Sequence, residues 1–294
     1  MKKPFDKIAR IGLIANSEKV DCRNLVRKAA RLIKATSREV ISDAATARLA
    51  GLKGATSPDA AHLTKEVDLL IVFGGDGTML RVAREIAGSD TPIVGINAGG
   101  LGFLTDVQAH QLPVALKQIF GGEIRLESRP LIEAWGEFCG VSMQLLALND
   151  FVITRGAAPR LIDLEVSINN EVMTRYRCDG LIVSTPTGST AYSLAAGGAV
   201  VTPNADVFEL TPICAHTLSN RSVILGMSSL IAVKVLSKRV ETILTADGQP
   251  PVILKAGDVI NIRRSRHSIR LLHLAGSSFF ETLRRKLDWS GSHI

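Results

Sequence analysis

The stretch GGDGTML, residues 74–80, combines glycines with one carboxylate in a pattern that suits phosphate chemistry. Glycine has no Cβ, so a ligand can lie directly on the backbone of Gly74, Gly75 and Gly77, and N–H groups at a helix start bind anionic oxygens. The stretch matches neither GxGxxG nor GK[ST], which excludes the standard dinucleotide fingerprint and the Walker loop. Simple anion capture does not explain why a carboxylate stands among these glycines.

Asp76 is the candidate catalytic residue of this stretch. A carboxylate can orient a hydroxyl and take its proton as a bond to phosphorus forms, or it can hold a divalent cation. The positive end of a helix also favours a negative side chain at this place. The alternative is that Asp76 merely caps the helix, although Thr78 is an equally good capping residue.

A second segment, TPTGSTAYSLAAGG at residues 185–198, is rich in hydroxyl groups and follows the apolar run GLIVS. Neutral hydroxyls and backbone N–H groups can hold a sugar or a diphosphate without the dehydration cost of buried charges. Tyr192 offers a ring that could stack on an adenine. The alternative is a Ser/Thr-rich turn that binds no ligand.

Two shorter features accompany these segments. The Asn149-Asp150 pair offers a donor, an acceptor and a carboxylate, which suit an adenine edge and ribose hydroxyls, although such a dipeptide is more often a turn. NAGGLGF, residues 97–103, is a second glycine-rich loop after an apolar run. Its pattern fits both a simple turn and a loop that contacts phosphate.

The periodicity of the chain indicates which elements position these residues. From residue 8 to about residue 120, short apolar runs alternate with helical patterns, which is typical of an α/β domain with a parallel sheet. We expect a helix over residues 21–35, a strand buried on both faces over 67–73, a helix over 78–88 and a strand over 92–97. Ligands of open α/β sheets bind at the carboxyl ends of strands, where GGDGT lies.

After about residue 123 the pattern changes to the alternation of a β-rich domain. The pairs Asn169-Asn170 and Asp247-Gly248 predict hairpin turns. The segment FFETLRRKLDW, residues 279–289, predicts a helix that packs back on the first domain. The residues expected on its packed face are Phe280, Leu283 and Leu287. We therefore predict an α/β domain over residues 1–123, a β-rich domain over 124–275 and a returning C-terminal helix over 276–294.

The composition excludes several classes of protein. With 294 residues, 46% apolar and 21% charged, the chain is typical of a globular protein of two domains. No apolar run reaches the roughly 18 residues that a membrane-spanning helix requires, and we expect a cytoplasmic protein. The four cysteines lie far apart and the histidines show no metal-ligand spacing, so neither disulfides nor a permanent zinc site is predicted.

The net charge of +7 suits an enzyme that attracts anionic substrates. The densest basic cluster is RRSRH, residues 263–267. It lies in an alternating segment without interleaved aromatic residues, so it predicts a solvated strand face rather than a nucleic-acid site. We expect no nucleic-acid or membrane partner.

Together these segments resemble bacterial NAD kinases, the ATP- or polyphosphate-dependent NAD kinase family. GGDGTML, GINAGGLGFLTD, NDFVITRG and TPTGSTAYSLAAGG occur in the order that the family shows, and the resemblance covers about residues 66–290. GGDGT alone is less specific, because diacylglycerol and sphingosine kinases share it. The TPTGSTAY segment, with the Asn-Asp pair before it, points to the dinucleotide substrate.

The resemblance implies an α/β domain followed by a β-rich domain, with an active site between them that is commonly shared in a homodimer or homotetramer. It implies transfer of the γ-phosphoryl group of ATP, or of a similar donor, to the 2′-hydroxyl of the adenosine ribose of NAD, with Mg²⁺ as the divalent metal. The motifs assign no metal ligands. A lipid kinase with the GGDGT motif and a non-catalytic dinucleotide-binding regulator are the alternatives.

The resemblance also assigns roles to single residues. Asp76 would accept the proton of the 2′-hydroxyl, and Gly74, Gly75 and Thr78 would form the phosphate loop. Asp150 departs from the family, whose pair usually reads Asn-Glu, so its shorter side chain implies a water-mediated contact. The implied substrate-binding residues are Gly77, Asn149, Asp150, Arg160, Arg177, Asp179, Thr190, Ala191, Tyr192, Ser193, Leu194, Ala195 and Gln249.

Overall fold

The structure is a computed structural model that describes residues 8–100, 102–216 and 221–289. Its contacts divide the chain into two units: unit 1 comprises residues 1–128 and 268–294, and unit 2 comprises residues 129–267. Leu101 of the second glycine-rich loop and the ends of the predicted first and last domains lie outside the described residues. The domain boundaries predicted at residues 123 and 275 stay predictions.

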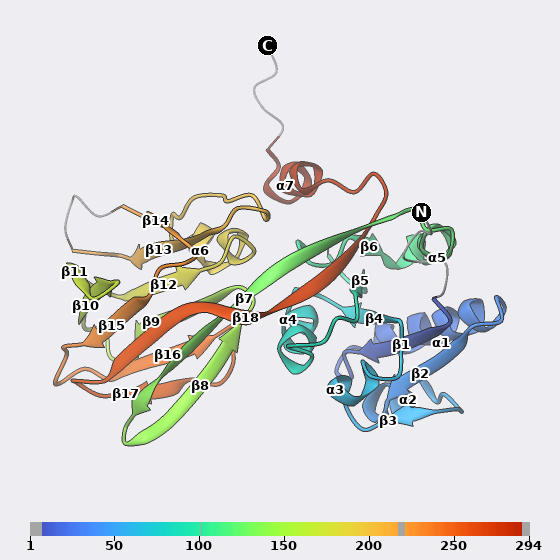
Figure 1. Ribbon diagram of the computed structural model, residues 1–294, viewed down its shortest axis with the longest axis horizontal. Coiled ribbons are helices and arrows are strands. Elements are labelled where there is room, and N and C mark those ends of the chain that lie inside the picture. The colour runs from blue at the N-terminus through green and yellow to red at the C-terminus, as the bar shows by residue number, and fades with distance from the viewer. Residues whose placement is uncertain (1–7, 101, 217–220, 290–294) are drawn as a thin grey trace, which may run out of the picture. The chain divides into compact units, whose positions relative to one another are not determined.

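Unit 1 is an α/β unit with a parallel sheet, as the alternation of strand and helix patterns predicted (Figure 1). Its own strands are β1 (Arg10–Ala15), β2 (Glu39–Asp43), β3 (Thr56–Ser57), β4 (Leu69–Gly74), β5 (Ile93–Asn97) and β6 (Val107–Gln108). Its helices are α1 (Val20–Lys34), α2 (Ala44–Ala50), α3 (Ala60–Leu63), α4 (Asp76–Glu85), η1 (Ala109–Gln111), α5 (Leu112–Phe120) and α7 (Phe279–Leu287). The strand order β5-β4-β1-β2-β3 places β1 beside β4 and β4 beside β5.

The core of unit 1 lies on both faces of this sheet. Every residue of β4 is buried, which confirms the strand predicted from its continuous apolar run. Ile71 and Phe73 of β4 share one hydrophobic cluster with residues of α1, α2 and α5. Leu70 and Val72 are also fully buried and alternate with them, so they belong to the other face. The strand therefore holds its carboxyl end, with GGDGT after it, in a rigid setting.

Unit 2 is β-rich, as predicted. Its strands are β8 (Val141–Ala147), β9 (Asp150–Arg155), β10 (Ile162–Ile168), β11 (Glu171–Cys178), β12 (Gly180–Ser184), β13 (Val207–Ile213), β14 (Val223–Gly226), β15 (Ile231–Val235), β16 (Thr242–Ala246) and β17 (Val252–Leu254). Two long strands, β7 (Ile124–Phe138) and β18 (Val259–Leu274), each run from one unit into the other. Two short helices, η2 (Gly188–Thr190) and α6 (Tyr192–Ala195), follow β12.

Two antiparallel sheets build unit 2. One has the order β14-β13-β12-β9-β16-β17, and the other joins β11, β10 and β15 to β18. Alternate residues of both sheets, such as Phe151 of β9 and Leu164 of β10, form one hydrophobic cluster. The predicted hairpin turns are confirmed, because the residue pairs 169–170 and 247–248 have the positive φ angles of such turns.

Helix α7 belongs to unit 1, and it confirms the predicted return of the C-terminal helix. The predicted packed face is wrong, because Phe280 and Leu287 are 56% and 40% exposed. Phe279 instead contacts Phe103, with ring centroids 6.4 Å apart, and Leu283 is buried. Residues 279 and 283 follow the i, i+4 spacing of one helical stripe, so the packed face contains Phe279 in place of Phe280.

Candidate functional site

Asp76 is the first residue of α4, directly after β4. We predicted that this helix begins at Thr78, and this is wrong, because Thr78 N and Met79 N already donate to Gly75 O at 3.0 and 3.2 Å. The cap residue is Gly75, and no side chain caps the helix. The alternative in which Asp76 or Thr78 only caps α4 therefore has no support in the geometry. Gly74 is needed as glycine, because a Cβ there would overlap the side chain of Thr78.

The carboxylate of Asp76 accepts hydrogen bonds from the second glycine-rich loop. Phe103 N donates to Oδ2 at 2.8 Å, Leu104 N donates to Oδ1 at 3.1 Å, and the Thr105 hydroxyl lies 3.3 Å from Oδ1. Gly102 permits this approach, because a Cβ at that position would overlap Asp76 Oδ1. The loop after β5 therefore orients the carboxylate, and the Asp76 side chain keeps 31% of its surface exposed.

Two lysines lie at the same edge of the unit 1 sheet. A Cβ added to Gly75 or to Gly99 would lie 3.9 Å from Lys19 Nζ in each case, so this ammonium lies beside both glycine-rich loops. Lys286 Nζ of α7 lies 4.0 Å from Asp76 Oδ2. Sequence reasoning missed both residues. Lys19 follows β1, which neighbours β4, so the strand order of a parallel sheet is the signal that would have found it.

A cavity of about 430 Å³ lies next to these loops within unit 1. Gly77, Thr78 and Arg81 of the GGDGT segment and α4 line one part of it, and Asn16 and Ser17 after β1 line another. Gly77 is exposed and a Cβ there would meet nothing within 4 Å. This edge of unit 1 thus combines open glycine backbone, an ammonium and an oriented carboxylate.

In unit 2 the Asn149-Asp150 pair is held by a residue that sequence reasoning treated only as a turn. Asp247 accepts hydrogen bonds from the backbone N–H groups of Leu148, Asn149 and Asp150 at 2.9, 2.8 and 3.2 Å. Asp150 is 5% exposed. Burial, with the negative charge of Asp247 as the second cause, raises the pKa of Asp150 to about 7. The only sequence signal for Asp247 was its place in the hairpin turn between β16 and β17.

The side chain of Asn149 carries an unsatisfied acceptor. Its Oδ1 is buried and receives no hydrogen bond from any residue that the structure describes. A buried oxygen without a donor costs about 1–3 kcal/mol, so native proteins seldom keep one without a function. The atom is therefore suited to a donor from a bound molecule, such as the amino group of an adenine.

The TPTGSTAY segment folds directly against this pair. Thr185 N donates to Asn149 O at 2.8 Å, and the Thr185 hydroxyl donates to Leu148 O at 2.6 Å. Gly188 lies so close that a Cβ would overlap Asn149 O. Hydrogen bonds thus bring together two segments that the sequence analysis singled out separately.

Most hydroxyls of this segment stabilise the loop itself. The Ser189 hydroxyl donates to Pro186 O, and the Ser193 hydroxyl donates to Glu209 Oε2, both at 2.8 Å. The Thr190 hydroxyl lies 3.3 Å from Thr187 O. The hypothesis that these hydroxyls are free donors for a ligand is therefore wrong for Thr185, Ser189 and Ser193, whose hydroxyl hydrogens are already used.

The other predicted residues of this region lie on the surface of the same part of unit 2. Tyr192 is 46% exposed, which leaves its ring open to stacking. Ala191 and Leu194 are partly exposed and Ala195 is exposed. Gln249 lies in the turn with Asp247, where its N–H donates to Ala246 O at 2.9 Å.

Arg160, Arg177 and Asp179 are further predicted residues of unit 2. Asp179 directly precedes β12, whose last residue Ser184 pairs with Asp150, so Asp179 and Ser184 lie roughly 17 Å apart along the strand. Asp179 accepts from Arg155 Nε at 2.6 Å. Arg160 and Arg177 line a cavity of about 480 Å³. The predicted substrate-binding residues of unit 2 therefore do not form one cluster.

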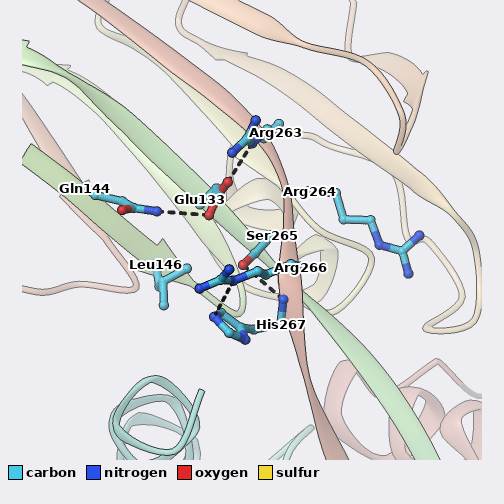
Figure 2. Close-up of a pocket in the computed structure, with 8 residues that line it drawn as sticks. All are labelled: Glu133, Gln144, Leu146, Arg263, Arg264, Ser265, Arg266 and His267. Carbon is cyan, nitrogen blue, oxygen red and sulfur yellow. Dashed lines mark hydrogen bonds and ion pairs between the residues drawn. The ribbon is translucent and has the colours of Figure 1, made fainter. Parts of the chain in front are cut away.

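Another cavity in unit 2, of about 1000 Å³, is lined by none of the predicted site residues. Figure 2 shows Arg263 and Gln144 directed at the carboxylate of Glu133, with bond lengths of 2.6 and 3.1 Å. Arg264 pairs with Asp206 at 2.8 Å. The arginines of the RRSRH cluster are exposed along β18, which confirms the predicted solvated strand face. Because two of these cations have carboxylate partners, we do not assign the reaction to this cavity.

The described residues contain no group of three or more His, Cys, Asp or Glu side chains placed to hold a metal ion. Among the same residues, no helix combines the length and the apolar character that crossing a membrane requires.

Comparison with known proteins adds a family to this geometry. The N-terminal and C-terminal domain models of ATP-NAD kinases match residues 11–124 and 148–274 of the chain. The NAD kinase of Syntrophotalea carbinolica is 39% identical over 281 residues, which cover 95% of this chain and 98% of that protein. The NAD kinase of Geobacter metallireducens is 42% identical over 244 residues, which cover 83% and 85%.

Two solved structures show the same architecture. A crystal structure of yeast NADH kinase complexed with NADH matches with a TM-score of 0.88 and 26% identity, covering 98% of this chain and 89% of that one. A crystal structure of an NAD kinase from Archaeoglobus fulgidus in complex with ATP matches with a TM-score of 0.75 and 27% identity, covering 96% and 100%.

Proposed function

The chain belongs to the NAD kinase family, and on this basis we propose that it transfers the γ-phosphoryl group of ATP to the 2′-hydroxyl of the adenosine ribose of NAD. The observation that carries the proposal is the setting of Asp76. Its carboxylate is partly exposed at the start of α4 and is oriented by Phe103 N and Leu104 N. A carboxylate held in this way can receive a substrate hydroxyl in one fixed direction.

In the proposed reaction Asp76 orients the 2′-hydroxyl and accepts its proton as the bond to phosphorus forms. A carboxylate has about four acceptor positions, so the donors from the loop after β5 leave room for the substrate hydroxyl. Phosphoryl transfer passes through a loose transition state, in which the protein mainly aligns the reactants and stabilises spreading negative charge. Lys19 and the open backbone at Gly75 and Gly99 provide positive potential for the phosphates of the donor.

The metal in this proposal is Mg²⁺ that arrives with the donor. Mg²⁺ is usually bound through substrate phosphates and one or two carboxylates. This mode of binding requires no group of three protein ligands, and the described residues contain none. Mg²⁺ would supply charge neutralisation between the phosphates when bound. A homodimer or homotetramer, which the family resemblance implies, and the cytoplasmic location expected from the sequence complete the proposal.

For the dinucleotide we propose the predicted residues of unit 2. The unsatisfied Oδ1 of Asn149 would accept from the adenine amino group, and Asp150 would face ribose hydroxyls. Tyr192 would offer its exposed ring for stacking. The further substrate-binding positions stay as predicted, with the Ser193 contact made through its main chain because its hydroxyl bonds to Glu209.

The test is NADP formation by the purified protein with NAD, Mg²⁺ and ATP, followed with a dehydrogenase specific for NADP. Parallel reactions with polyphosphate as donor and with a lipid alcohol as acceptor distinguish the alternatives. Absence of NADP with every donor would contradict the proposal. Formation of a phosphorylated lipid without NADP would favour a lipid kinase.

The matching variant is Asp76→Asn. We expect NAD binding to persist while turnover falls by at least about a hundredfold, the lower end of general-base effects. An Asn amide would also turn N–H groups toward the backbone donors of residues 103 and 104 and so disturb the contact with the loop. Thr105→Val serves as a control for a disturbed contact with this loop. This change removes the hydroxyl contacts with Asp76 and with Asn97 Nδ2 and keeps the carboxylate and its backbone donors, so turnover should fall by less than about tenfold. Turnover near the wild-type value in Asp76→Asn would reject the catalytic role.

A further inference from the structure

Lys286 lies in the last turn of α7, where its neighbours point to solvent. Arg284, Arg285 and Lys286 are all exposed residues, and 29% of the Lys286 side-chain surface is accessible. Leu283, one turn earlier, is buried and fixes this face of the helix against unit 1. The ammonium of Lys286 is thereby carried 4.0 Å from Asp76 Oδ2.

Phe103 holds both partners of this pair. Its backbone N–H donates to Asp76 Oδ2 at 2.8 Å, and its ring lies 4.6 Å from Lys286 Nζ in a cation–π contact. The same ring contacts Phe279 at the start of α7. The second glycine-rich loop therefore positions the carboxylate and the ammonium together.

Stability does not account well for this arrangement. The distance of 4.0 Å exceeds that of a charge-assisted hydrogen bond, and a partly exposed ion pair contributes little to folding. The ammonium is therefore not fixed to the carboxylate by a short hydrogen bond, and it lies close enough to Asp76 to contact an anion bound beside that carboxylate.

We propose that Lys286 is a further catalytic residue, whose ammonium contacts the phosphoryl group as it is transferred. This proposal rests on the proposed function of Asp76. The 2′-oxygen attacks the γ-phosphorus, its bond to phosphorus forms, and the bond between that phosphorus and the β–γ bridging oxygen breaks to release ADP. The hydroxyl proton passes to Asp76, while Lys286 stays protonated throughout.

The physical reason is the redistribution of charge in this step. Asp76 loses its negative charge as it takes the proton, and negative charge accumulates on the oxygens of the phosphoryl group and on the leaving group. An ammonium between them interacts with the carboxylate before the step and with the phosphoryl oxygens during it. Such an interaction is stronger in the transition state than in the ground state, which is the condition for faster turnover.

The experiment compares Lys286→Met, Lys286→Arg and Arg285→Met in the full-length protein. Arg285 is the matched control, because it is the exposed cation next to Lys286 on the same helical turn. For each variant, kcat, KM for ATP, KM for NAD and the melting temperature are measured. Removing one preorganised donor costs about 10²–10³ in kcat at enclosed sites, and the partial exposure of Lys286 leads us to expect at least about tenfold for Lys286→Met.

In Lys286→Met, KM for NAD and the melting temperature should stay near their wild-type values. Lys286→Arg should recover most of kcat, and Arg285→Met should match the wild type. Unchanged kcat in Lys286→Met overturns the proposal. A loss of kcat that Lys286→Arg does not restore, together with a lower melting temperature, also overturns the proposal. Such a result would indicate that Lys286 has a structural role. If the wild type forms NADP, Asp76→Asn abolishes this activity and Lys286→Met leaves it unchanged, only the proposal for Lys286 is rejected. If the wild type forms no NADP, both proposals are rejected.

Discussion

At the scale of single residues, the two carboxylates of the candidate site have different environments. Asp76 is partly exposed and accepts from backbone N–H groups of the loop after β5. Asp150 is 5% exposed, and its burial, together with the charge of Asp247, raises its pKa to about 7. The environment rather than the residue type thus separates the partly exposed carboxylate that we propose as the proton acceptor from a buried carboxyl group with a raised pKa.

This ionisation predicts a pH-dependent stability. The folded protein retains a proton on Asp150 up to about pH 7, whereas the unfolded chain releases it near its ordinary value of 3.8. The stability contributed by Asp150 is therefore full below about pH 4 and is lost as the pH rises through 7. The measured quantity is the free energy of unfolding of Asp150→Asn minus that of the wild type. This difference should be more positive at pH 8 than at pH 5 by at least about 1 kcal/mol.

Urea unfolding at the two pH values measures this difference. Glu171→Gln is the control, because Glu171 is an exposed carboxylate at the start of β11 and its replacement should act equally at both pH values. An effect of Asp150→Asn that is the same at pH 5 and pH 8 would contradict the assignment.

At the scale of elements, the candidate catalytic region of unit 1 is the product of neighbouring parallel strands. Strands β1, β4 and β5 lie side by side, so the segments that follow their carboxyl ends meet at one edge of the sheet. These segments carry Lys19, the GGDGT motif and the loop with Gly102 and Phe103. The second glycine-rich loop, which the sequence left open between a turn and a phosphate contact, contributes N–H donors to Asp76.

The close contact at Gly102 predicts how strongly a side chain there would disturb the orientation of the Asp76 carboxylate. In Gly102→Ala the new Cβ would overlap Asp76 Oδ1 and the Thr105 hydroxyl, so the carboxylate must move. Because small displacements of a reacting group cost much of its alignment, we expect NADP formation to fall by at least about tenfold. Gly100→Ala is the control, since a Cβ there would meet nothing within 4 Å. Equal activities of the two variants in the coupled assay would show that the loop does not position Asp76.

At the scale of the whole molecule, unit 1 contains Asp76 and unit 2 contains the Asn149-Asp150 pair. Two strands, β7 and β18, continue from one unit into the other, so the chain crosses between the units within regular structure. A ligand that binds the native protein stabilises it by mass action, whichever residues carry the chemical step. Binding and turnover can therefore be measured separately in the intact chain.

We expect NAD at a hundred times its Kd to stabilise the wild type and Asp76→Asn equally, by about 2.7 kcal/mol. In Asn149→Ala the acceptor for the adenine amino group is absent, so the same NAD concentration should stabilise by less than about 1 kcal/mol. Thermal unfolding with and without NAD measures the three values. A full NAD effect in Asn149→Ala would remove Asn149 from the binding site.

Much of the fold was predictable because its signals are local. The apolar run of β4, the amphipathic spacing of α1 and the turn residues at 169–170 and 247–248 each depend on neighbours along the chain. The face of α7 was predicted wrongly, since Phe280 and Phe279 are equally apolar and only tertiary contacts select Phe279. The hydroxyls of Thr185 and Ser193 in the TPTGSTAY segment were also misjudged, because their acceptors, Leu148 O and Glu209, lie in other parts of the chain.

The sequence by itself determined the change from an α/β to a β-rich pattern, the family and the candidate role of Asp76, because these depend on residue types at short spacings. Only the tertiary structure decided what surrounds that carboxylate and the Asn149-Asp150 pair. Phe103 N, Leu104 N and Lys286 reach Asp76 from other parts of the chain, and Asp247 reaches Asn149 in the same way. The physical reason is that hydrogen bonds and ion pairs depend on distance in space, and sheet order and helix packing create those distances only when the chain folds.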